Sequence, residues 1–98
     1  MPFRHVVMFQ WVDDIDPDHV AKVRDRLDAL PVLVDEIRAY SHGADVGVTE
    51  GNFDYVVVAD FDNVADFRAY RVHPDHVLLI EEVITGYVAE RAAVQYQT

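Results

Sequence analysis

Apolar side chains recur at every second position at the start of the chain, and this alternation predicts a β-strand over residues 3–12. One face of this strand would carry Phe3, His5, Val7, Phe9 and Trp11, and the other Arg4, Val6, Met8, Gln10 and Val12. Both faces include apolar residues, so we expect both to be covered. The chain's own helices can supply one cover and a second subunit the other.

The apolar spacing changes to three and four residues in the next segment, which predicts an amphipathic helix. Asp16 suits its N-cap and Pro17 its first helical position. The apolar stripe consists of Val20, Val23, Leu27 and Leu30. We expect Pro31 to end this helix and His19, in its first turn, to be solvated. Residues 32–36 are compatible with either a short helical turn or a loop.

Alternation returns in residues 37–46 and again in residues 53–61, where it is clearest. The first segment would place Tyr40, His42, Ala44 and Val46 on one face, and the second Phe53, Tyr55, Val57, Ala59 and Phe61. Residues 49–52 are turn-forming types. The short link predicts that the two strands pair as an antiparallel hairpin.

A proline divides the helical pattern of the second half of the chain. Asp62 or Asn63 would cap the first of two helices. The inner side of that helix carries Phe67 and Tyr70. His73 precedes Pro74 and is therefore pushed out of the α region, so one helix should end there and another begin.

The remaining segments complete a β-α-β-β-α(α)-β order. Apolar positions up to Ile84 predict the second helical segment, and Gly86 stands where a C′ glycine would end it. Residues 87–96 predict the last strand. Split βαβ halves in this order form a four-stranded antiparallel sheet with helices on one face, the ferredoxin-like α+β arrangement.

The sheet face away from the helices would gather Val6, Met8, Val56 and Val58 into one apolar patch. Such a patch is larger than a monomer usually exposes. The hydrophobic content of 51% is also high for so short a chain. We therefore predict a two-fold homodimer in which the open sheet faces pack together.

Length and composition restrict the class of protein further. Ninety-eight residues suffice for one domain, residues 1–98. The chain has no cysteine, which excludes disulfides and fits a reducing cytoplasm, where we expect the protein. We recognise no secretory leader, and no apolar run approaches the ~20 residues that span a bilayer.

The charge balance argues against nucleic acid and anionic membranes as partners. The formal net charge is −10, from 18 acidic and 8 basic residues, and Lys22 is the one lysine. Binding to a phosphate backbone relies on clustered lysine and arginine. A small apolar ligand remains a possible partner.

Histidine and tyrosine are the candidates for chemistry. His76 lies near a helix start, where the helix dipole favours the neutral, basic imidazole. Beside the hydroxyl of Tyr70 in an apolar pocket, it would form an acid–base pair. His5 lies in the middle of an apolar strand. For His5 and Tyr70, a buried side chain with one structural hydrogen bond is the simpler interpretation.

A metal or cofactor site is not indicated. His73 and His76 are three residues apart, but Pro74 breaks the helix that would place both rings on one face. His42 is expected on the surface of its strand. The chain has no nucleophile elbow, phosphate-binding glycine loop or dinucleotide fingerprint. We therefore expect neither a metal nor a cofactor.

Several stretches together resemble the stress-responsive α/β-barrel (Dabb) domain family, over essentially the whole chain. They are His5-Val6-Val7-Met8-Phe9, Leu30-Pro31 and Phe61…Tyr70…His73-Pro74-Asp75-His76. The resemblance implies a ferredoxin-like protomer whose dimer encloses a β-barrel between the two sheets. One branch, similar to plant olivetolic acid cyclase, closes a linear polyketide by intramolecular aldol condensation without losing a carboxyl group.

The resemblance also implies roles for individual residues. The positions matching Tyr70 and His76 are catalytic in that branch, and the position matching His5 lines its pocket. His76 would remove a carbon-bound proton, Tyr70 would bind the enolate or orient the imidazole, and His5 would support the attacked carbonyl. The walls would be Val7, Phe9, Val20, Val23, Leu27, Phe67, Val77, Ile80 and Tyr87. Val23 and Tyr87 fall near positions where that branch has a tyrosine and a tryptophan, so the pocket shape differs.

Two other classes of function stay open. The same pocket could hold a small apolar molecule without turning it over, or the dimer could be purely structural in stress protection. The dimeric barrel monooxygenases share this fold, but their Asn, Trp and His arrangement is not recognisable, and we rank them lowest. Fold alone does not separate these classes. A cyclase or lyase requires that His5, Tyr70 and His76 converge on a cavity.

Overall fold

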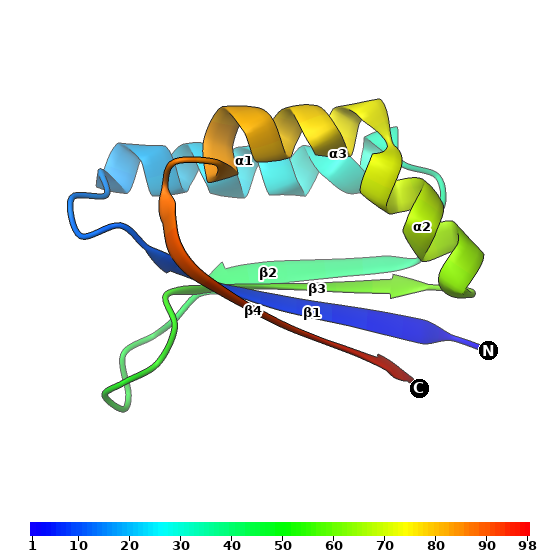
Figure 1. Cartoon of the computed structure of the whole chain (residues 1–98), viewed down its shortest axis with the longest axis horizontal. Coiled ribbons are helices and arrows are strands. Elements are labelled where there is room, and N and C mark those ends of the chain that lie inside the picture. Colours follow the sequence, from blue (N-terminus) through cyan, green and yellow to red (C-terminus); the bar gives the residue numbers. More distant parts are fainter.

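The computed structural model describes residues 1–98, and its elements follow the predicted β-α-β-β-α(α)-β order (Figure 1). In chain order they are β1 (Phe3–Trp11), α1 (Pro17–Leu33), β2 (Ala39–Ala44), β3 (Tyr55–Phe61), α2 (Val64–Val72), α3 (Pro74–Leu79), the π-helix η1 (Ile80–Ile84) and β4 (Val88–Gln97). The strands form one antiparallel sheet in the order β2-β3-β1-β4. The helices all lie on one face of this sheet (Figure 1). The expected ferredoxin-like α+β fold is therefore confirmed.

The helix-facing side of the central strands forms the hydrophobic core. Every second residue of β1 and β3 is buried, as the alternating pattern predicts. These residues are Phe3, His5, Val7, Phe9 and Trp11 on β1, and Tyr55, Val57, Ala59 and Phe61 on β3. Most residues of the edge strand β4 are exposed. Helix-facing side chains of β4 therefore border the core instead of lying inside it.

The opposite face of the sheet is apolar along its centre and has no cover. Val6 of β1 lies opposite Val58 of β3 and Val94 of β4. The next row consists of Val56, Met8 and Ala92. Val94 is 62% exposed. The predicted patch is thus present as two adjoining rows across three strands.

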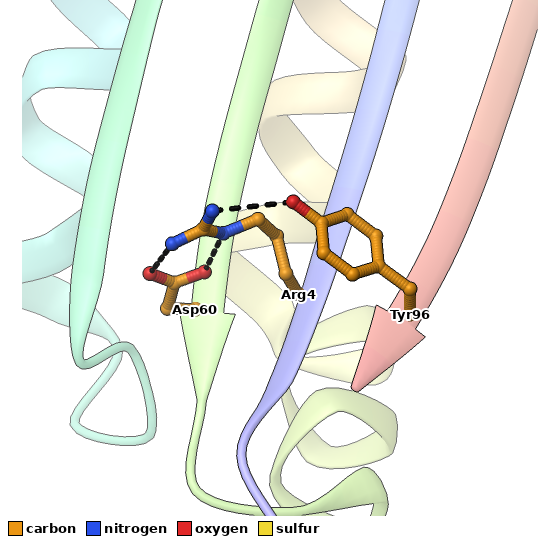
Figure 2. Close-up of polar contacts among 3 residues, drawn as sticks. All are labelled: Arg4, Asp60 and Tyr96. Atoms are coloured by element: carbon orange, nitrogen blue, oxygen red, sulfur yellow. Dashed lines mark hydrogen bonds and ion pairs between the residues drawn. The ribbon is translucent and has the colours of Figure 1, made fainter. Parts of the chain in front are cut away.

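A polar cluster closes one end of this open face (Figure 2). The guanidinium of Arg4 donates to both carboxylate oxygens of Asp60, at 2.7 and 3.0 Å, and to the hydroxyl of Tyr96, at 3.2 Å. The Arg4 guanidinium lowers the pKa of the Asp60 carboxyl. These contacts join β1, β3 and β4, so the end of the apolar face is bordered by satisfied polar groups.

Helix α1 extends beyond the expected end at Pro31. Asp16 caps it as predicted, since its carboxylate accepts from the Asp18 N–H at 2.8 Å. The helix continues to Leu33, and the N–H of Val34 donates to the carbonyl of Leu30 at 3.0 Å. A proline in the last turn removes one hydrogen bond without breaking the following ones. No helix in the structure is both long and apolar enough to cross a membrane.

Two histidines that were expected at the surface are held by tertiary contacts. The imidazole of His19 stacks on the ring of Tyr87, with centroids 3.6 Å apart, and its Nε2 lies 2.8 Å from the Val83 carbonyl oxygen. His42 bridges the Tyr55 hydroxyl and the Asp28 carboxylate, at 2.7 Å each. The expectation of a solvated ring was therefore wrong for His19, and His42 is likewise not a free surface side chain, because partners from distant segments of the chain pack against both rings.

The helix break at His73 is confirmed. His73 has an extended backbone (φ −60°, ψ 133°), ends α2 and caps α3, where its Nδ1 accepts from the Asp75 N–H at 3.2 Å. Pro74 is the first residue of α3. The sequence pattern did not indicate the π-helix η1 that follows. Gly86, at φ 90°, ends this helical region as predicted.

The observed strands are shorter than predicted at several ends. The segment predicted over 37–46 is a strand from Ala39 to Ala44, and the segment predicted over 53–61 begins at Tyr55. The expected antiparallel pairing of these two strands is present. Residues 45–54 therefore form a longer connection, which extends beyond the sheet (Figure 1).

Candidate functional site

A cavity of about 370 Å³ lies between the helices and the sheet. Its floor comes from the strands β1, β2 and β3, and its other walls come from α1, α2, α3, η1 and β4. His5, Tyr70 and His76 all line it. Three residues that were selected from separate parts of the sequence therefore face one space.

The cavity includes five of the nine walls that the sequence suggested. These are Val7, Phe9, Leu27, Phe67 and Ile80. Val57, Leu79 and Ile84 complete the apolar lining. The walls are mostly aliphatic and aromatic, so the interior suits an apolar molecule.

The other four suggested walls lie elsewhere. Val23 is fully buried in the core, and Val20 packs against the core from a partly exposed position. Val77 is 39% exposed on α3. Tyr87 precedes β4 and stacks on His19. The spacing of apolar residues along a helix or strand predicts which of them are buried, but not which of the buried ones border a cavity. This explains why four of the suggested walls do not line it.

His76 is held in the neutral form that can accept a proton. It lies in the first turn of α3, and its Nδ1 donates to the main-chain carbonyl of Arg71 at 3.1 Å. A carbonyl only accepts, so this contact fixes the ring proton on Nδ1. Burial lowers the pKa of His76. The Nε2 lone pair makes no hydrogen bond within the protein.

His5 is held in the opposite tautomer. The side-chain amide Nε2 of Gln95, which can only donate, lies 3.1 Å from His5 Nδ1. The ring proton is then on Nε2. Burial, together with the positive charge of Arg91, lowers the pKa of His5 to about 4. His5 therefore presents an N–H donor where His76 presents an acceptor.

A pair of tyrosines adds a further hydroxyl donor. The hydroxyl oxygens of Tyr70 and Tyr40 lie 3.1 Å apart, and the Tyr70 ring lies 4.2 Å from the imidazole of His76. Burial raises the pKa of both tyrosines, so both keep their protons at neutral pH. One hydrogen bond between two hydroxyls uses one proton and leaves the other for a ligand.

Four polar lining residues were not identified as site residues from the sequence. They are Tyr40, Arg71, Arg91 and Gln95. Tyr40 shares its strand face with His42, and that face is the helix-facing one in the structure. Arg91 and Gln95 lie opposite Phe9 and His5 in the β1–β4 pairing. Knowing that register would have identified both, but the sequence alone does not give it.

The arrangement brings together the kinds of group that a proton transfer uses. A neutral base, an N–H donor and a hydroxyl face the same apolar space. No group of three or more histidine, aspartate or glutamate side chains is placed to hold a metal ion. His73 and Asp75, which flank Pro74, are not among the residues that line the cavity.

Comparison with protein families gives a match over nearly the whole chain. The sequence model described as Stress responsive A/B Barrel Domain matches residues 3–98. A relative from Arabidopsis thaliana, described as a stress-response A/B barrel domain-containing protein, is 26% identical over 93 residues. The match covers 94% of this chain and 35% of that protein, so the chain spans about a third of the relative's length.

Solved structures give the same fold. A dimeric ferredoxin-like protein of unknown function from Thermobifida fusca is 42% identical, with a TM-score of 0.93, and the match covers 100% of this chain and 92% of that one. The hydroxynitrile lyase of Passiflora edulis is 17% identical, with a TM-score of 0.85, over 97% of this chain and 91% of that one. At this identity the lyase shows a shared fold alone.

Proposed function

This chain belongs to the stress-responsive A/B barrel domain family, and on that footing we propose that it is a cofactor-independent acid–base enzyme of the cyclase or lyase kind. Its substrate would be a small, largely apolar carbonyl compound that occupies the cavity. His76 acts as the base, and His5 and Tyr70 act as donors to the developing oxyanion.

The opposite tautomers of His76 and His5 are the observation that carries this proposal. His76 Nδ1 faces a carbonyl oxygen and His5 Nδ1 faces an amide nitrogen. The first ring therefore offers a lone pair at Nε2 and the second a proton at Nε2. Burial lowers the pKa of both histidines. If the two histidines had only a structural role in the core, there would be no need for one to face the cavity with a free acceptor nitrogen and the other with a free N–H donor.

Each proton that moves has a named donor and acceptor. His76 Nε2 takes a proton from a carbon next to a carbonyl, and the C–H electrons move onto that carbonyl oxygen as an enolate. The N–H of His5 and the free hydroxyl of the Tyr70–Tyr40 pair stabilise the negative charge. When the enolate carbon attacks a second carbonyl, the imidazolium of His76 returns its proton to the new alkoxide. Run in reverse, the same steps cleave a carbon–carbon bond.

The apolar walls contribute to this chemistry by excluding water. Val7, Phe9 and Leu27 line the cavity, and all three are buried. A low-dielectric surrounding strengthens the donor contacts to an oxyanion and keeps the imidazoles neutral. A substrate about as large as a single aromatic ring would be oriented mainly by the shape of the cavity and by the few polar side chains that line it.

The base can be tested without knowing the natural substrate. 5-Nitrobenzisoxazole is a small planar compound that loses one carbon-bound proton to a base, opens its N–O bond and gives a coloured phenolate. We expect wild-type protein to accelerate this reaction and His76→Ala to lose at least about tenfold of that rate, because a positioned base contributes 10²–10⁴-fold. Tyr70→Phe should lose less.

A matched control is His73→Asn, which keeps an acceptor for the Asp75 N–H and lies outside the cavity. It should retain the wild-type rate. Equal rates for wild type and His76→Ala would contradict the acid–base function. If the probe then still binds in the cavity, the chain is a binding module for small apolar molecules.

We also propose that two copies of this chain associate through the open sheet face. The Thermobifida fusca relative is described as dimeric. On this chain the rows through Val6 and Met8 give an apolar centre, and the Arg4–Asp60–Tyr96 cluster gives a polar border (Figure 2). An apolar core with a polar rim is typical of protein–protein interfaces.

A further inference from the structure

The distribution of basic side chains around the cavity is unexpected for so acidic a chain. Of 18 acidic residues, none lines the cavity, whereas two of the 8 basic residues, Arg71 and Arg91, do. Random placement on a protein of net charge −10 would give the opposite balance. The cavity is therefore locally positive within a negative molecule.

Neither arginine is neutralised by the protein. The arginines that have ion pairs are Arg4, Arg26 and Arg38, which face Asp60, Glu82 and Asp62. Arg71 and Arg91 have no carboxylate within ion-pairing distance and donate no side-chain hydrogen bond. A guanidinium has five N–H donors, so two complete sets of donors are left for solvent or a ligand.

Helix-end electrostatics explain only part of this pattern. Arg71 lies in the last turn of α2, where a cation is favoured by the helix dipole. Arg91 lies on β4 opposite Phe9, where no helix end attracts a positive charge. Its side chain nevertheless faces the helix side of the sheet, at the uncovered edge where the cavity meets solvent.

Because His5 and His76 are neutral, Arg71 and Arg91 are the charged side chains that line the cavity. Both arginines contribute to keeping His5 uncharged, after burial as the main cause. Among the lining residues, Arg71, Arg91 and Gln95 are exposed and therefore mark the mouth of the cavity, whereas the apolar Phe9, Leu27 and Ile84 are buried. This gradient fits a molecule with an anionic head and an apolar body.

We propose that the cavity binds small carboxylic acids, with the carboxylate held at the mouth by Arg71 and Arg91 and the apolar part inside. This inference rests on the proposed function, since it names the substrate class of the same cavity. Planar guanidinium and carboxylate groups match as paired N–H···O contacts, which favours an acid over a neutral compound of equal shape. The head group would fix which carbon of the ligand lies near His76.

The test compares two ligands that differ in charge only. 4-Phenylbutanoate and 4-phenylbutanamide are titrated into the intact protein, with heats or chemical shifts as the readout. We expect wild type to bind the acid at least about tenfold more tightly than the amide, and this preference to shrink as salt is added. Arg71→Gln and Arg91→Gln should each reduce the preference, and the double variant should abolish it.

Arg68→Gln is the matched control, because Arg68 lies on the same helix as Arg71 but outside the cavity. It should keep the full preference for the acid. The proposal is overturned if acid and amide bind equally, if neither binds at millimolar concentration, or if the double variant keeps the preference.

These outcomes separate the two proposals. Loss of the acid preference together with an intact His76-dependent rate on 5-nitrobenzisoxazole contradicts the carboxylate site alone. An intact acid preference with no His76-dependent rate contradicts the acid–base function alone.

Discussion

At the scale of single residues, two hydrogen bonds decide what the cavity can do. The partners of His76 and His5 at Nδ1 are a carbonyl and an amide nitrogen, and these assign the two rings opposite roles at Nε2. Neither role follows from the residue type, because every neutral histidine has one donor and one acceptor. The main-chain carbonyl of Arg71 and the side chain of Gln95 are therefore as important to the site as the imidazoles.

The buried His5 should make folding stability depend on pH. Its pKa is about 4 in the folded chain against 6.5 for an ordinary histidine. Between these values the unfolded chain binds a proton that the folded chain does not, so stability is complete above pH 6.5 and falls as pH drops towards 4. The loss from this residue should reach roughly 3 kcal/mol.

Urea unfolding at pH 7 and at about pH 4.5 measures this loss. The His5→Gln variant should lose less stability than wild type over that interval, whereas carboxylates contribute equally to both proteins. An identical pH dependence in His5→Gln and wild type would show that His5 is not held neutral by the fold.

At the scale of elements, the joint between α2 and α3 positions the site. The His73-Pro74 break ends one helix near Tyr70 and Arg71 and starts another at His76. The two helices thereby present side chains from both ends of the joint to one cavity. Their own caps, Asn63 for α2 and His73 for α3, determine where each helix begins.

The cap of α2 gives a prediction for stability. The Asn63 side-chain oxygen accepts from the Asp66 N–H at 2.8 Å. Asn63→Ala should lower the free energy of unfolding by about 1 kcal/mol, because the N–H loses its partner. Asn63→Asp keeps an acceptor and adds a favourable charge at the helix start, so it should match wild type or exceed it. Chemical denaturation measures both, and equal losses in the two variants would rule out the cap as the cause.

The parts of the structure that were predicted correctly from the sequence are those that depend on residues close together in the chain. Alternation identified the strands, and the His73-Pro74 dipeptide identified the helix break, because both depend on neighbouring residues only. The positions of Tyr40, Arg91 and Gln95 depend on strand order and register, which arise from contacts between distant segments. The π-helix η1 and the extension of α1 past Pro31 likewise reflect packing that overrides local preference.

At the scale of the whole molecule, the candidate site and the proposed dimer interface lie on opposite faces of one sheet. The cavity lies on the sheet face that the helices cover, and the rows through Val6 and Met8 lie on the opposite face. Alternate side chains of the same strands would therefore serve the two proposed functions.

Dimer formation can be tested with two matched surface changes. Val94, 62% exposed on the open sheet face, and Val32, 83% exposed on α1, are both replaced by Asp. Val94→Asp should shift the protein from dimer to monomer, because it puts two charges into an apolar interface. Val32→Asp should remain dimeric. Sedimentation equilibrium at micromolar concentration measures this, with circular dichroism as the check on folding, and a dimeric Val94→Asp would place the interface elsewhere.

Nitrogen-15 NMR of the histidine rings at about pH 7.5 measures directly how the imidazoles of His76 and His5 are protonated. We expect His76 to be neutral with its proton on Nδ1, and His5 to be neutral with its proton on Nε2. The His76→Ala and His5→Gln variants each lack one imidazole, so the signals missing from their spectra assign the two rings. A His76 ring that is protonated on Nε2 at this pH, whether charged or in the other neutral tautomer, has no base to offer the cavity and would contradict the account.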